Sequence, residues 1–229
     1  LRNTTGVIHH FDSGTYIKYL GQVGQDLVES IYSYTYYTTV PVPMLFEEGF
    51  ADFDLEDQGF INLGWRGWEG DLPATIISPC SESDSFMNNQ KILAYYNETI
   101  ELSAKRMYPV VSYFHQDPRP DKFQGTAITG VSPYMGNQIP ELTNTIVFCD
   151  FAKSFSRGPT RGSLGYTFVR PDCHPNDFFE IVPAFDFKAQ PAYYVSLGSN
   201  MDQTRIFLGV YGSPNVTDPN LGTIFELVP

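Results

Sequence analysis

The chain has 229 residues, of which 42% are hydrophobic and 15% aromatic, enough to bury a sizeable core in one large domain or two small ones. Asp and Glu outnumber Lys and Arg by 26 to 14, and the resulting net charge of −12 argues against nucleic acid as a partner. Because no apolar run reaches the roughly 18 to 20 residues that cross a bilayer, no transmembrane segment is expected.

Short β-branched and aromatic segments follow one another along the chain, and turn residues separate them at intervals of about ten residues. Helical spacing is nearly absent, because 19 glycines and 17 prolines interrupt the chain at short intervals. The pattern predicts an all-β fold, and it leaves sandwich, barrel and propeller open. In chain order, the predicted strands lie at 30–37, 59–65, 107–114, 125–136, 144–151, 165–170, 178–185, 192–199, 205–212 and 222–228.

Two longer segments interrupt this rhythm. The acidic stretch 45–58 reads LFEEGFADFDLEDQ, and the polar stretch 78–90 reads SPCSESDSFMNNQ. Both exceed the usual length of a strand connection, so we expect them to be insertions, with a short helix in the second.

Cysteine and asparagine motifs give limited information on compartment. Cys80, Cys149 and Cys173 lack the spacing of a metal site, and they are compatible with one disulfide or with three thiols. The sequons at Asn3, Asn97 and Asn215 suggest a glycosylated, extracellular protein.

Six segments in the same order resemble the soluble glucose and sorbosone dehydrogenase family: LRNTTGV (1–7), GQVGQDLVESI (21–31), INLGWRGWEG (61–70), PVVSYFH (109–115), AITGVSPYMGNQIPELTNTIVFCDF (127–151) and GTIFELVP (222–229). The resemblance implies a six-bladed β-propeller that uses pyrroloquinoline quinone (PQQ) and calcium. The same family includes the propeller of hedgehog-interacting proteins.

The resemblance also implies which part of the propeller is present. The LRN motif of the family lies near the middle of its propeller, so residues 1–229 are expected to form the C-terminal half, about three blades. The missing N-terminal half is then an expected partner, since half a propeller exposes blade faces that should be paired.

Five positions match residues that contact the cofactor or the metal in the family. Arg2, Asn3 and Lys153 are expected to bind PQQ, while backbone carbonyls of Gly24 and Gln25 are expected to bind calcium, an ion that prefers oxygen ligands. Calcium would act as the Lewis acid when a sugar transfers hydride to the quinone. The catalytic base of the family lies in the N-terminal half, outside this sequence.

The segment INLGWRGWEG combines two tryptophans with three glycines. In the family a strand leaves the core here through a glycine-rich turn, with a tryptophan near the cofactor side. The glycines are Gly64, Gly67 and Gly70, and they allow backbone conformations closed to other residues. The simpler interpretation, which we favour, is that both rings pack in the core between blades.

Two departures from the family leave a second function open. Glucose-oxidising members have an arginine pair near the cofactor carboxylates, but the corresponding stretch 188–200 contains no arginine. The histidines lack the catalytic motif, and His115 is more readily explained as a hydrogen-bonded structural residue. The function that the resemblance implies is PQQ-dependent oxidation of a sugar or polyol. The departures leave open an alternative, in which the protein is an extracellular propeller that serves as a non-catalytic binding or structural module.

Overall fold

The computed structural model describes residues 4–12, 15–24, 28–37, 60–63, 68–70, 72–73, 104–106, 108–115, 117, 122–153, 160–169, 177–184, 191–212 and 221–229. Within these ranges strands dominate, and a single 3-10 turn, η3 (Pro140–Leu142), is the one helical element. No helix in the same ranges is long and apolar enough to cross a membrane.

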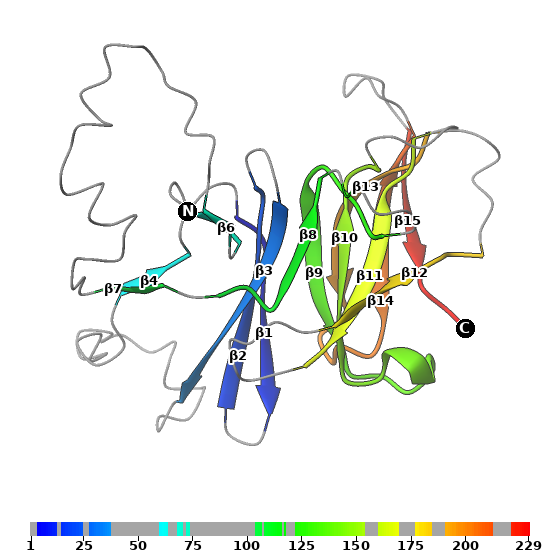
Figure 1. Cartoon of the computed structure of the whole chain (residues 1–229). Coiled ribbons are helices and arrows are strands. Elements are labelled where there is room, and N and C mark those ends of the chain that lie inside the picture. The colour runs from blue at the N-terminus through cyan, green and yellow to red at the C-terminus, as the bar shows by residue number, and fades with distance from the viewer. Residues whose placement is uncertain are drawn as a thin grey trace, which may run out of the picture.

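Three antiparallel sheets contain most of the described strands (Figure 1). The first sheet has the order β1-β2-β3-β8, formed by Thr4–Asp12, Thr15–Gln22, Val28–Tyr37 and Val111–Phe114. The central sheet has the order β12-β11-β10-β9, formed by Phe178–Ile181, Ser163–Phe168, Thr145–Asp150 and Ile128–Tyr134. The third sheet has the order β13-β14-β15, formed by Tyr193–Ser199, Ile206–Tyr211 and Gly222–Glu226.

Two small strand pairs accompany these sheets. Strand β4 (Phe60–Asn62) pairs in parallel with β7 (Ala104–Arg106), and β5 (Trp68–Glu69) pairs in antiparallel with β6 (Leu72–Pro73). Gly70 lies in the turn between β5 and β6 with a φ of +60°, and an added Cβ there would lie 2.8 Å from Ser112 Oγ. A side chain is therefore disfavoured at Gly70, as expected for a glycine in this segment.

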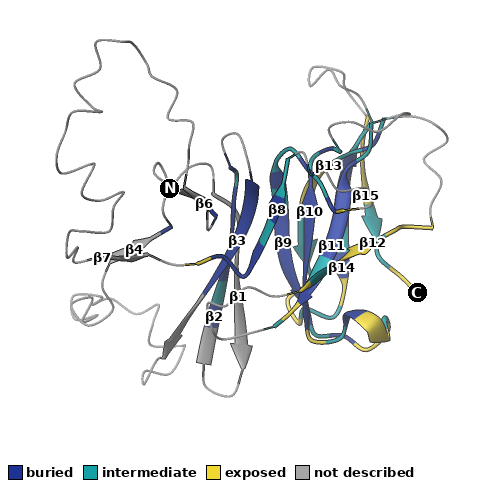
Figure 2. Cartoon of the chain, in the orientation of Figure 1, coloured by how far each residue is buried: buried dark blue, intermediate teal, exposed yellow. Residues whose placement is uncertain are grey.

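The three sheets share one topology and are stacked on one another. In each sheet every strand pairs with the described strand before it, except that β8 follows β3 after the small pairs. Strands β1 and β2 of the first sheet pack against β9, and β9 and β10 pack against β13 of the third sheet. The central sheet is therefore covered on both faces, as Figures 1 and 2 show.

Strand β10 lies inside the stack, and all six of its residues are buried. Ile146 and Phe148 join a hydrophobic cluster with the first sheet, whereas Val147 and Cys149 join a cluster with the third sheet. This division follows from the alternation of side chains along a strand. Burial of each such side chain contributes on the order of 1.5 to 3 kcal/mol.

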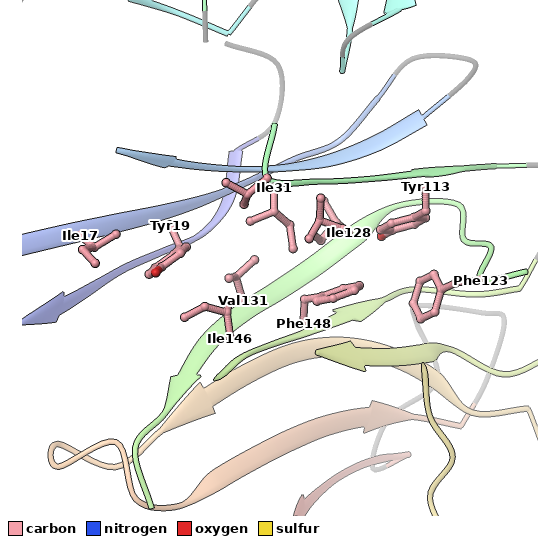
Figure 3. Close-up of a cluster of buried hydrophobic side chains, with 11 residues drawn as sticks. Ile17, Tyr19, Ile31, Tyr113, Phe123, Ile128, Val131, Ile146 and Phe148 are labelled. Atoms are coloured by element: carbon pink, nitrogen blue, oxygen red, sulfur yellow. The ribbon is translucent and has the colours of Figure 1, made fainter. Parts of the chain in front are cut away.

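Aromatic rings fill the layer between the first and central sheets. Phe148 lies 5.4 Å from Phe123 and 6.0 Å from both Tyr113 and Phe178, measured between ring centroids. Figure 3 shows Tyr113, Phe123 and Ile128 near Phe148, with Val131, Ile146 and Ile17 farther along the same layer. The layer thus joins strands that are distant in sequence.

The all-β prediction is confirmed, and each of the ten predicted segments overlaps a described strand. The prediction missed β1 and β2, where a lysine and two histidines interrupt the apolar pattern, and it also missed the short strands β5, β6 and β7. In the described residues the three sheets form a stack that does not close into a ring or barrel. The predicted insertions 45–58 and 78–90, and the short helix in the second, lie outside the described residues.

Candidate functional site

Several connections between strands meet at one end of the first and central sheets. At this end, which we call the loop end, β2, β8 and β10 finish and β3, β9 and β11 begin. Two buried carboxylates, Glu29 near the start of β3 and Asp150 at the end of β10, lie here. They are the polar centre of the loop end.

Glu29 connects three segments of the chain. Its Oε1 accepts a hydrogen bond of 3.1 Å from the backbone N–H of Gly24, and it lies 2.6 Å from His115 Nε2. Its Oε2 accepts a hydrogen bond of 2.8 Å from the backbone N–H of Ile128, at the start of β9. One carboxylate therefore fixes the turn after β2, the end of β8 and the start of β9.

Asp150 connects the same region from the central sheet. Its Oδ1 accepts backbone hydrogen bonds from Thr126 at 2.7 Å and Ala152 at 3.1 Å. Its Oδ2 accepts the hydroxyl proton of Tyr113 at 2.7 Å and the N–H of Ala127 at 3.1 Å. A buried carboxylate needs such donors, because burial without partners is costly.

Gly125 makes the close approach of this loop possible. An added Cβ at Gly125 would lie 2.1 Å from the carboxyl carbon of Asp150, far inside van der Waals contact. A side chain here would displace either the carboxylate or the loop that donates to it.

The electrostatics of the pair follow from burial. Desolvation raises the pKa of Asp150 from 3.8 to about 6, although hydrogen bonds from Thr126 and Tyr113 act in the opposite direction and Glu29 adds to the rise. Burial likewise raises the pKa of Tyr113 well above its ordinary value of 10.0, and the charges of Asp150 and Glu29 reinforce it. Tyr113 therefore remains a hydrogen-bond donor at neutral pH.

The predicted site residues can be located only in part. Gly24 lies in the loop end with its N–H bound to Glu29, and Lys153 follows β10 at the same end. The Lys153 ammonium forms an ion pair with Glu180 of β12. Arg2, Asn3 and Gln25 lie outside the described residues, as do Trp65 and Arg66 of the glycine-rich segment.

The sequence predictions did not identify Glu29, Asp150 or Tyr113 as site residues. Each lies in a segment of strand character, where a charged or hydroxyl side chain normally faces water. The sequence does contain one signal for Asp150, because a carboxylate follows directly at the end of an otherwise apolar strand, TIVFCD. His115 agrees with its interpretation as a hydrogen-bonded histidine, because its Nε2 contacts Glu29.

The arrangement can be tested for its fit to calcium and to PQQ. No group of three or more His, Cys, Asp or Glu side chains in the described ranges could hold a metal ion. Carbonyl ligands at 24 and 25 would suit calcium, and the carboxylates of Glu29 and Asp150 favour a nearby cation. The same negative charges oppose the three carboxylates of PQQ, and Lys153 already contacts Glu180. The negative charge of the described part of the loop end therefore disfavours a tricarboxylate, and no described group of side chains there could hold a metal ion.

Comparison of the chain with protein-family models, with curated proteins and with solved structures finds no match in any of the three.

We predict that Gly125→Ala destabilises the protein by about 3 kcal/mol, because the new methyl group overlaps the Asp150 carboxylate. Gly198→Ala is the matched control, since nothing lies within 4 Å of the added Cβ on β13. The control should be neutral or stabilising by up to about 1 kcal/mol. Urea denaturation of both variants measures the difference, and equal stability of the two would contradict the packing described.

The pH dependence of stability provides a second prediction. Asp150 holds its proton up to about pH 6 when folded, but an unfolded aspartate releases it near 3.8. The folded state therefore binds the proton more tightly, and its advantage is lost as the pH rises through this window. The free energy of unfolding of the wild type, minus that of Asp150→Asn, should fall by about 3 kcal/mol between about pH 3 and about pH 7. A difference that does not change with pH would show that Asp150 titrates normally.

Proposed function

We propose that the three sheets are consecutive blades of a β-propeller of the glucose and sorbosone dehydrogenase type, to which this chain contributes the C-terminal half. The observation that carries the proposal is the position of the first strand of each sheet. Strand β9 packs against both β1 and β13, so the first strands of three successive meanders are neighbours. Radial blades require this arrangement, because each blade begins at the central axis.

On this fold, we infer an extracellular, calcium-supported binding module without catalytic activity. The turn after β2 contains Gly24, and the backbone N–H of Gly24 donates a hydrogen bond to the Glu29 carboxylate. Calcium held by carbonyls of this turn would cross-link the loop end and would be favoured by the two buried carboxylates. The absence of arginine from 188–200 and the ion pair of Lys153 with Glu180 argue against a site for PQQ.

Oxidation of a sugar or polyol with PQQ is the second candidate. Gly24 and Lys153 lie at the same end of neighbouring sheets, which favours this candidate. Two residues that belong to one cofactor site must lie close to each other in this way. The bound quinone would accept the hydride, and the residues of this chain would only position it. Lys153 would have to exchange Glu180 for a cofactor carboxylate.

Titration with calcium and PQQ separates the two candidates. We expect calcium, but not magnesium, to raise the melting temperature, because ligand binding to the folded state stabilises it by about 2.7 kcal/mol at a hundredfold excess over Kd. Lys153→Met should leave this shift unchanged. We expect no PQQ-dependent reduction of a dye with aldoses or polyols.

Two results would contradict this inference. Dye reduction that requires both PQQ and a sugar, and that Lys153→Met weakens, would establish the dehydrogenase instead. The lack of any shift with calcium would remove the metal from the proposal.

A further inference from the structure

Strand β12 forms the outer edge of the central sheet. Among the described strands it pairs only with β11, and Figure 1 shows it at the outer side of the sheet. An edge strand of this kind presents a row of backbone donors and acceptors that its own sheet does not use. The open side of β12 can therefore accept a further strand.

Contacts with β11 determine which backbone groups of β12 face outward. The carbonyl oxygen of Asp177, directly before β12, accepts a hydrogen bond of 2.9 Å from a threonine hydroxyl of β11. The carbonyl oxygen of Phe179 lies 3.1 Å from the position of an added Cβ at Gly165 of β11. Both carbonyls thus face β11. Because backbone groups alternate along an antiparallel strand, the N–H and C=O groups of Phe178 and Glu180 face the open edge.

Three aromatic rings of β11 and β12, which we call the aromatic cluster, lie on one face of this edge. Tyr166 and Phe179 are opposite each other in the register, with ring centroids 5.4 Å apart. The ring of Phe168 lies 6.3 Å from Tyr166 and 6.1 Å from Phe179, nearly perpendicular to both. Phe168 and Phe179 have exposed fractions of 51% and 45%. Exposed aromatic side chains in mutual contact are typical of a surface that binds a partner.

The charge beside the aromatic cluster is negative. Asp177 is exposed, and continuation of the register between β11 and β12 places it opposite Phe168. A carboxylate beside exposed aromatic rings favours a cation, because the face of a ring also attracts positive charge. The chain contains one such arrangement, since Arg205 pairs with Glu226 and its guanidinium lies 5.1 Å from the ring centroid of Phe207. The net charge of −12 attracts a basic partner over a longer range.

We propose that β12 binds an extended, basic segment of a partner protein by strand addition, and that the aromatic cluster contacts apolar residues of this segment. Its backbone pairs with the outward groups of Phe178 and Glu180, and a lysine or arginine lies near Asp177. Main-chain hydrogen bonds supply the affinity and alternate side chains the specificity. A second copy of the chain is a poorer occupant, because two copies of charge −12 repel each other. The segment would be the target of the binding module proposed above, and in this respect the inference rests on the proposed function.

A designed peptide tests this surface on the full chain. The probe is a fluorescent peptide of about ten residues that alternates Phe or Val with Lys, the length and pattern of a strand. One control has the same composition with its apolar residues grouped at one end, and a second has Glu in place of Lys. We expect only the alternating basic peptide to bind, more weakly at high salt, and to slow hydrogen exchange at Phe178 and Glu180 on the order of tenfold.

Phe179→Thr tests the aromatic cluster, because it removes one exposed ring and keeps a residue that suits a strand. Ile224→Thr is the matched control, since it removes an apolar side chain of 76% exposure from β15 in the third sheet. We expect Phe179→Thr to weaken binding of the peptide on the order of tenfold and Ile224→Thr to leave it unchanged.

Glu180→Pro tests the pairing of the backbone, because it removes an outward N–H from an edge strand, where proline is tolerated. Glu180→Ala is the matched control, since it loses the same carboxylate and the same ion pair with Lys153 but keeps the N–H. We expect the proline variant to lose binding and the alanine variant to retain it. Loss in both variants would show that charge alone attracts the peptide and would contradict strand addition.

Three further outcomes would overturn the proposal. The first is equal binding of the alternating and grouped peptides, and the second is binding that Phe179→Thr leaves unchanged. The third is protection of the outward amides that grows with protein concentration without peptide, since the occupant would then be a second copy. The effect of calcium on the melting temperature is measured for the same samples, so a failure at β12 is distinguishable from a failure of the proposed function.

Discussion

Two buried carboxylates hold the first and central sheets in register at one end. Glu29 belongs to the first sheet but accepts the N–H of Ile128 at the start of β9, and Asp150 belongs to the central sheet but accepts the hydroxyl of Tyr113 from β8. Each carboxylate thus reaches across the interface. Removal of either set of donors would leave a buried charge without partners, which costs several kcal/mol. The loops at this end take their positions from that requirement.

The central sheet transmits this order to the rest of the stack. Because Phe148 faces the first sheet and Cys149 faces the third, the strand that carries Asp150 contributes to both hydrophobic layers. The backbone N–H of Tyr194 in β13 donates to the carbonyl of Phe151, directly after Asp150. The loop end is therefore connected to all three sheets, and a ligand bound there would contact elements distant in sequence.

The sequence predicted most of the longer strands because β-branched and aromatic residues between turn residues are a local pattern. Segment 145–150 carries β-branched and aromatic residues between turn residues, and it became β10. Strand β2 was missed although Ile17 and Tyr19 are buried, because Lys18 and the glycine and glutamine at its end resemble a loop. The carboxylate pair was not predictable in this way, since Glu29 and Ile128 are brought together by sheet stacking, which no local pattern records.

The same limit applies to function. Gly24 and Lys153 were assigned to the site through a resemblance of motifs. The sequence around Lys153 does not show that this residue forms an ion pair with Glu180. This pairing became visible only from the position of β12 beside β11. The charge around the loop end, rather than any single motif, favours a cation over an anionic cofactor. The proposed function rests on two features, the stacking of successive sheets and the negative charge of the loop end.

Hydrogen exchange at Thr126, Ala127 and Ile128 tests the role of the carboxylates most directly, because their amides donate to Asp150 and Glu29. If the carboxylates hold the two sheets together, these amides exchange as slowly as those in the interior of β10. Exchange at the rate of an exposed loop, while β10 remains protected, would show that the sheets are joined by hydrophobic contacts alone.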